Sequence, residues 1–202
     1  MIEDYIKNEK LELSIKQVAK NDAPFCGDSY FYIIEEDYFI CVLADGLGSG
    51  EFAYESSQSV IDVVKEYHQL ELETLLDKCN RVLINKRGAA VAILKVYFNK
   101  QQFQYISVGN IRFFLLQPSS DKLIFPPPTS GFLSGRAMKF QCKTFQYEPF
   151  SQFILYSDGL ELKEIKTYLN RRNSIKQITN VIWNANVGQS DDTTLLMGSL
   201  FQ

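Results

Sequence analysis

Carboxylate side chains in this sequence stand at the ends of apolar segments, where they could bind metal ions. Asp45 ends the apolar run 39–44 and Asp158 ends the run 153–157, and a glycine follows each of them. A carboxylate at the last residue of a buried strand is fixed at the edge of its sheet. The glycine after it has no Cβ that would keep a ligand away.

Further acids precede apolar segments: Asp28, within Gly27-Asp28-Ser29, and the pair Asp191-Asp192. Divalent cations such as Mg²⁺ and Mn²⁺ prefer carboxylate, carbonyl and water oxygens, and a cluster of carboxylates without a cation repels itself. Because the chain has one histidine and no C-x-x-C pair, an oxygen-only site is the metal chemistry open to it.

Each acidic motif taken singly has a plain structural interpretation. Asp-Gly is a common hairpin turn, although helix-like sequence rather than a partner strand follows both Asp-Gly pairs. Asp191-Asp192 alone could equally be a turn or a helix terminus. A metal site is therefore indicated by the set of acids and not by any one of them.

Apolar periodicity predicts the elements that would position these acids. Alternating or short continuous apolar blocks predict strands, and apolar residues at helical spacing predict two helices after Gly50 and two more near the C-terminus. The expected order is strands at 11–18, 30–34 and 38–43, two helices through 60–67 and 72–83, an antiparallel meander through 89–116, a strand at 153–156, helices at 160–169 and 175–182, and a strand at 193–200.

This order predicts an α+β fold. Sheets with one apolar face and helices with one apolar stripe must cover each other. A four-layer αββα sandwich, with two packed antiparallel sheets flanked by helix pairs, satisfies the order. The proline-rich segment 119–135 reads as an irregular connection because strand patterns resume after it, so we expect one domain over residues 1–202.

Composition excludes several classes of function. The chain has 202 residues, 46% of them hydrophobic, which suits one compact domain. A net charge of -3 leaves no basic surface for nucleic acid. No apolar run reaches the roughly 20 residues of a spanning helix, and residues 1–10 are too polar for a secretory signal. We therefore expect a soluble cytoplasmic protein with no nucleic-acid or membrane partner, whose four scattered cysteines stay reduced.

Six motifs together resemble those of the type 2C, or metal-dependent, protein phosphatases, and they occur in the family's order across nearly the whole chain. The motifs are G-D-S at 27–29, L-A-D-G-L-G-S-G at 43–50, R-G-A-A-V-A at 87–92, S-V-G-N-I-R at 107–112, Y-S-D-G-L at 156–160 and D-D-T-T at 191–194.

The resemblance implies a protein phosphatase acting on phosphoserine and phosphothreonine with two divalent ions, Mn²⁺ or Mg²⁺. It implies that Asp45 bridges both ions and that Gly46 offers its carbonyl oxygen. Asp158 and Asp191 would complete the coordination of one ion, and Asp28 would bind the other directly or through water. Catalysis would depend on Asp45 and Asp158, with in-line attack of water on phosphorus and no phosphoenzyme.

Within the family, the chain is similar to short bacterial regulators of the general stress response. This similarity implies that it dephosphorylates STAS-type scaffold and antagonist proteins of the stressosome. The chain would then be a negative feedback regulator of the general stress sigma-factor pathway. We expect it to act as a monomer whose activity follows the supply of substrate.

The sequence departs from the family pattern at several positions. Leu47 stands where many members have a histidine that is a proposed general acid, and Asn110 stands where some have a third-metal aspartate. Asp192 falls where members often have asparagine, so Asp191 is the preferred ligand. Lys86 or Arg87 could meet the substrate phosphate, although a solvated helix end is the simpler interpretation.

Other functions fit the sequence less well. The glycines at 46, 48 and 50 suggest a nucleotide loop, but they do not form the dinucleotide fingerprint G-x-G-x-x-G. A histidine-dependent hydrolase would need His68, which we expect on the surface of a helix. The main alternative is a catalytically inactive protein that keeps the phosphatase fold and binds partners.

Overall fold

The structure is a computed structural model that describes residues 1–169, 173–186 and 190–201. Within these residues the chain forms two antiparallel sheets and four α-helices, which confirms the predicted α+β class. The chain divides into two compact units, each assembled from separate stretches of sequence. One comprises Met1–Asp22, Arg112–Pro126 and Tyr147–Gln202, and the other comprises Ala23–Ile111 and Pro127–Gln146.

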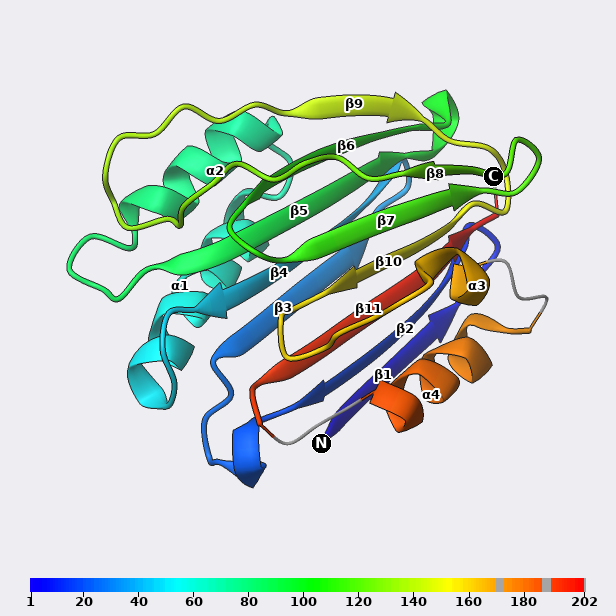
Figure 1. Ribbon diagram of the computed structural model, residues 1–202. Helices are drawn as coiled ribbons and strands as arrows, with labels where there is room; N and C mark the ends of the chain where they lie inside the picture. Colours follow the sequence, from blue (N-terminus) through cyan, green and yellow to red (C-terminus); the bar gives the residue numbers. More distant parts are fainter. Residues whose placement is uncertain (170–172, 187–189, 202) are drawn as a thin grey trace. The chain divides into compact units, whose positions relative to one another are not determined.

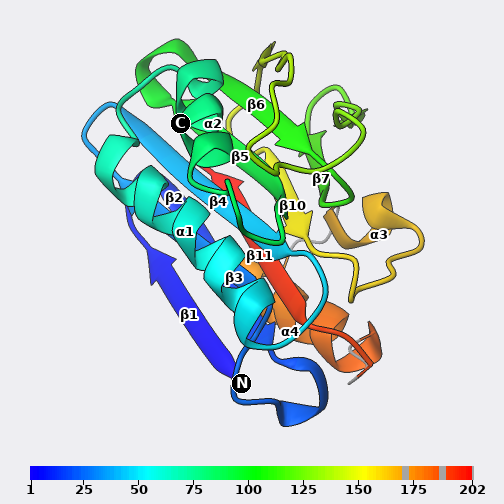
Figure 2. The ribbon, with the colours of Figure 1, turned by 90° about the vertical axis from the view of Figure 1, so that its left-hand side faces the viewer.

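The second unit holds a five-stranded sheet in the order β3-β4-β5-β6-β9. The strands are β3 (Asp28–Ile34), β4 (Tyr38–Gly46), β5 (Ala89–Tyr97), β6 (Gln102–Val108) and β9 (Lys143–Gln146). Its helices α1 (Glu51–Tyr67) and α2 (Leu72–Arg81) lie side by side over this sheet (Figure 2). The apolar stripes of both helices and one face of β4, β5 and β6 share a buried core.

Lys95 of β5 fixes the C-terminal end of α1. Its buried ammonium group donates hydrogen bonds to the carbonyls of His68, Gln69 and Leu70, at 2.9, 3.3 and 3.0 Å. These carbonyls have no acceptor role inside the helix, so a cation there is stabilising. His68, expected at the surface, is half-buried at the end of α1, and its Nδ1 lies 2.6 Å from the hydroxyl of Tyr38.

The first unit holds a six-stranded sheet in the order β1-β2-β11-β10-β7-β8 (Figure 1). The strands are β1 (Ile2–Lys7), β2 (Leu11–Val18), β11 (Thr193–Leu200), β10 (Gln152–Tyr156), β7 (Arg112–Gln117) and β8 (Lys122–Ile124). Helix α3 (Ile165–Leu169) packs on β7 and β10, and α4 (Ile175–Asn186) packs on β2 and β11. Their apolar residues form this unit's own core with the sheet.

The structure corrects the predicted meander through 89–116. β5 pairs with β6, but β7 pairs with β10 and β8 in the other sheet. Periodicity identifies a strand and not its partner, and the turn at Gly109-Asn110 sends the chain to the second sheet. β1 and β8 were not predicted, because β1 is a largely exposed edge strand and β8 has three residues.

Two expectations about environment can be compared with the structure. All four cysteines are free, as expected, and Cys41 and Cys79 are buried. Among the described residues, no helix combines the length and the apolar character needed to cross a membrane.

Candidate metal centre

Asp28 and Asp45 face each other across two strands. Asp28 opens β3, Asp45 lies next to the last residue of β4, and the two are direct partners in the antiparallel register. Directly opposite residues point to the same face with Cβ atoms about 4.5–5.5 Å apart, and like charges there are destabilising. Asp28 is buried and Asp45 is half-buried, so a cation between them would offset a real repulsion.

Gly46 brings α1 onto the end of β4. A Cβ at this position would lie 1.9 Å from the carbonyl oxygen of Ala53, which is backbone and cannot move aside. The Gly46 amide donates to the carbonyl of Gly27 at 3.1 Å and so fixes the strand end beside Asp28. The glycine therefore has a packing role that the sequence did not reveal, and its role as a carbonyl ligand stays a prediction.

Asp158 and Asp191 form a second acidic pair, in the other unit. Asp158 lies two residues after β10 and Asp191 two residues before β11, and these strands are antiparallel neighbours. The Ser157 amide donates to the Thr194 carbonyl at 3.1 Å, and the Thr194 amide donates to the Ser157 hydroxyl at 2.9 Å. These hydrogen bonds join the two segments beyond the end of the β10–β11 pairing.

The pKa of Asp158 is raised above its ordinary value. Partial desolvation by the surrounding protein is the main cause, although the side chain is solvent-accessible, and the carboxylate of Asp191 adds a second, electrostatic cause. Both causes disfavour the charged form. A divalent cation would reverse the second of them, so this pair fits the donor set of a hard metal ion.

Gly159 allows the two acidic segments to approach closely. A Cβ there would lie 2.2 Å from the Asp192 carbonyl oxygen and 2.4 Å from Thr193 Oγ1. We expect Gly159→Ala to lower the free energy of unfolding by about 1–3 kcal/mol, as overpacking does, and to weaken Mn²⁺ binding. Chemical denaturation and calorimetric titration measure the two effects. Gly198→Ala is the matched comparison, because its Cβ would meet the Phe153 ring at 2.5 Å within the same sheet and it is not among the predicted metal ligands.

The adjacent acids Asp191 and Asp192 have different surroundings. Asp192 is buried and its carboxylate accepts a hydrogen bond from the backbone amide of Lys20 at 2.8 Å. Asp191 is half-buried, and its carboxylate lies 4.0 Å from the Lys20 ammonium. Asp192 thus holds the segment after β2 in place, which is a structural reason for an acid at that position.

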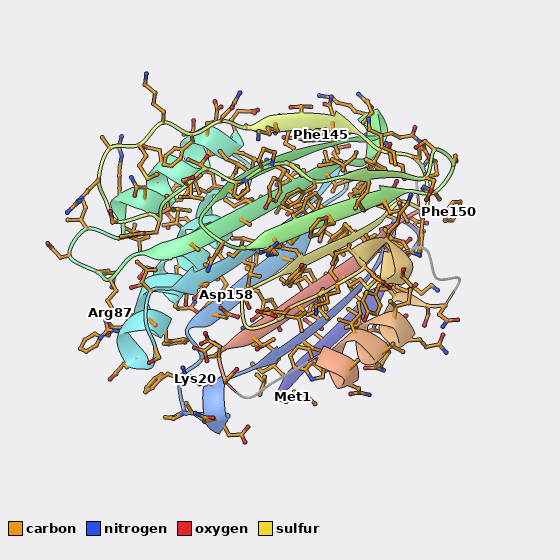
Figure 3. The ribbon with its side chains drawn as sticks, viewed as in Figure 1. Met1, Lys20, Arg87, Phe145, Phe150 and Asp158 are labelled. Carbon is orange, nitrogen blue, oxygen red and sulfur yellow. The ribbon has the colours of Figure 1, made fainter. Side chains whose placement is uncertain are left out.

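A cavity of about 300 Å³ opens beside Asp158, which Figure 3 labels. Arg112 and Lys163 line it together with Tyr156. Burial raises the pKa of Tyr156 to about 12, although the nearby Arg112 guanidinium acts in the opposite direction. Arg112 is the last residue of the motif S-V-G-N-I-R, but no periodicity in the sequence indicates that it lines a cavity with Asp158.

The predicted ligands thus form two carboxylate pairs on different units. Asp28, Asp45 and Gly46 belong to the five-stranded unit, and Asp158 and Asp191 belong to the six-stranded unit. Among the residues that the structure describes, no group of three or more Asp, Glu, His or Cys side chains is gathered closely enough to hold a metal ion.

Comparison with known proteins identifies close relatives. Residues 35–199 match the family model described as stage II sporulation protein E (SpoIIE). The sequence is 39% identical over 194 residues to the phosphoserine phosphatase RsbX of Bacillus subtilis (strain 168), covering 96% of this chain and 97% of the relative. A crystal structure of RsbX in complex with magnesium matches with a TM-score of 0.94 at 38% identity, covering 98% of this chain and 100% of that one.

More distant solved structures share the fold. A structure described as the bacterial stressosome, a modular system adapted to control secondary messenger signalling, matches with a TM-score of 0.85 at 23% identity, covering 94% of this chain and 99% of that one. The catalytic domain of the serine/threonine protein phosphatase PstP in complex with two manganese ions matches with a TM-score of 0.72 at 16% identity, covering 96% and 99% of the two chains.

Proposed function

The chain belongs to the SpoIIE family, and from this premise we propose that it is a metal-dependent protein phosphatase acting on phosphoserine and phosphothreonine. The observation that carries the proposal is the placing of Asp28 opposite Asp45, and of Asp158 close enough to Asp191 to raise its pKa. Carboxylates arranged in this way are destabilising without a cation. They are expected where a site is built for function and not for stability.

We propose that Asp28, Asp45, Gly46, Asp158 and Asp191 together hold two divalent ions, Mn²⁺ or Mg²⁺. All five donors are oxygens, which suits these ions, and the RsbX and PstP structures contain magnesium and manganese respectively. Ions held there would lower the pKa of water and neutralise charge on the transferring phosphoryl oxygens. Asp45 would take the bridging role that the family resemblance implies, and it stands opposite Asp28 at the end of β4, an inner strand of its sheet.

The chain's own residues also limit how the leaving group is protonated. Leu47 has no titratable side chain, and its backbone amide donates to the carbonyl of Gly88 at 3.0 Å. The serine oxygen that leaves must therefore receive its proton from water or from another residue. The same hydrogen bond joins the backbone after Asp45 to the segment before β5.

The proposed physiological substrates are STAS-type scaffold and antagonist proteins of the stressosome. The 39% identity to RsbX over nearly all of both chains supports this substrate class, together with the sequence similarity to regulators of the general stress response. Dephosphorylation would return the sigma-factor pathway to rest, as negative feedback. We propose that the protein acts in the cytoplasm as a monomer within one catalytic domain, residues 1–202.

Release of phosphate from a phosphoserine peptide tests the activity. We expect turnover with Mn²⁺ or Mg²⁺ and none in chelator. Absence of turnover with both metals, for a folded protein that still binds phosphorylated STAS protein, would instead favour the inactive phosphatase-fold binding protein. A comparison of phosphoproteomes with and without the protein identifies the substrate.

A further inference from the structure

Arg87 stands on a rigid loop next to the segment that follows Asp45. Gly46 and Asp45 pair with Ala89 and Ala90 in the register of β4 and β5, so residue 87 comes just before the paired region. The Leu47 amide donates to the Gly88 carbonyl at 3.0 Å and ties the two loops together. The pairing of β4 with β5 therefore brings Arg87 near the acidic end of β4.

The backbone next to Arg87 is also held from its other side. Ala89 and Leu133 exchange backbone hydrogen bonds of 3.0 and 2.9 Å. A Cβ at Gly88, whose φ is +101°, would lie 2.6 Å from the Leu133 carbonyl oxygen. The segment that carries Arg87 is therefore packed on both sides, which is the support a binding residue requires.

The Arg87 side chain has a defined position without a counter-charge. Its guanidinium lies over the ring of Phe52, with the carbon 5.3 Å from the ring centroid, and a Cβ at Gly48 would lie 2.4 Å from its Nη1 atom. In the described part of the chain, no carboxylate lies within ion-pair distance of Arg87 or of the neighbouring Lys86. Figure 3 shows Arg87 next to the start of α1.

A cavity of about 470 Å³ adjoins these cations. It is lined by Phe52, Glu55, Asn85, Lys86 and Arg87. The charged residues of this lining are Glu55, Lys86 and Arg87, so its net charge is positive. Phe52, whose exposed fraction is 61%, gives the cavity an apolar wall. This combination fits an anionic group attached to a peptide, because a guanidinium binds phosphate oxygens in pairs and an aromatic ring holds the guanidinium plane.

We propose that this cavity binds the phosphoserine segment of the substrate and that Arg87 contacts the substrate phosphate. The inference rests on the proposed phosphatase function and assigns a substrate-binding residue to it. Arg87 stands close in register to Asp45, so the phosphate that it binds would lie at the acidic strand end. Its contact with the phosphate is present before and during reaction, so its loss affects KM more than kcat.

Steady-state kinetics of Arg87→Ala test the proposal, with Arg81→Ala as the matched control. Arg81 is on α2 in the same unit, and its side chain is 73% exposed and paired with Asp77. We expect R87A to raise KM about tenfold or more for both a phosphoserine peptide and p-nitrophenyl phosphate. R81A should stay near the wild type, since exposed ion pairs contribute little. R87K should recover only part of the loss, because a lysine cannot bind two oxygens at once.

The two substrates separate contact with phosphate from contact with peptide. If R87A has the KM of R81A for both substrates, Arg87 does not bind the substrate and the inference is overturned. If R87A raises KM for the peptide alone, Arg87 contacts another part of the substrate and the assignment to phosphate is equally overturned. Equal thermal midpoints of R87A and R81A confirm that both variants are folded.

A binding experiment in chelator keeps this inference separate from the proposed function. We expect inorganic phosphate to shift the NMR resonance of the Arg87 side-chain N–H, identified by its loss in R87A, in a saturable manner. Absence of a shift contradicts the inference even when the wild type is an active phosphatase. Conversely, a saturable shift in a protein that shows no turnover would contradict the proposed function and leave the phosphate contact standing.

Discussion

Asp45→Asn is expected to lower kcat/KM for a phosphoserine peptide by about a thousandfold or more, the equivalent of the several kcal/mol that a bound metal ion contributes to catalysis. Asparagine keeps the shape of the side chain but removes its charge, so it cannot bridge two cations. Asp45 also faces Asp28 across the strands, where removal of one of two like charges relieves repulsion. The variant should therefore fold at least as stably as the wild type in chelator.

Steady-state kinetics across a range of Mn²⁺ concentrations measure this effect, with circular dichroism as the check on folding. Asp62→Asn is the matched control because Asp62 is exposed on α1 in the same unit, where its carboxylate accepts a hydrogen bond from the side-chain amide of Gln58 at 2.8 Å. If D45N retains activity near that of D62N at saturating Mn²⁺, Asp45 does not bridge metal ions and the catalytic assignment is wrong.

Asp158→Asn should separate stability from metal binding. Its pKa is raised by desolvation and by Asp191, so the ionised side chain opposes folding in the absence of metal. We expect D158N to melt about 1–3 °C above the wild type in chelator, a modest gain because solvent screens an accessible charge. Saturating Mn²⁺, at about a hundred times its dissociation constant, should raise the melting temperature of the wild type by about 5–10 °C, and D158N should lose most of that rise.

The difference in melting temperature between D158N and the wild type should depend on pH, because the pKa of Asp158 is raised in the folded protein. Because the folded pKa of Asp158 lies above the unfolded one, its protonated form contributes stability that is complete below the unfolded pKa and is lost as pH rises through the folded pKa. The melting temperatures of D158N and the wild type should thus differ little at pH values below the unfolded pKa of Asp158. They should diverge as the pH rises through its folded pKa. Glu9→Gln, at an exposed turn of the same unit, is the control. A wild type that melts above D158N in chelator would contradict the assigned charge repulsion.

Much of this fold could be predicted from periodicity. The strands 11–18 and 193–200 match β2 and β11 at both ends, and polar residues, Glu9-Lys10 and Asp191-Asp192, mark where each strand begins. The pairing of β7 with β10 could not be predicted, since a meander and a crossing to another sheet have the same local pattern. Pairing depends on contacts between segments that are far apart in sequence.

The candidate site was predictable where a residue's role depends on its place at a strand end. Asp28 and Asp45 stand at such ends, and the structure places them in direct register. The roles of Gly46 and Asp192 needed the structure, because one admits the Ala53 carbonyl of α1 and the other accepts the Lys20 amide. Neither contact has a sequence signal, since each joins segments through backbone atoms.

The location of bound manganese tests the central claim most directly. Anomalous scattering from a crystal of the full chain grown with Mn²⁺ should show two ions, with Asp45 contacting both and with Asp28, Asp158 and Asp191 completing their surroundings. Ions bound at one carboxylate pair alone, or only at other acids of the surface, would contradict the account.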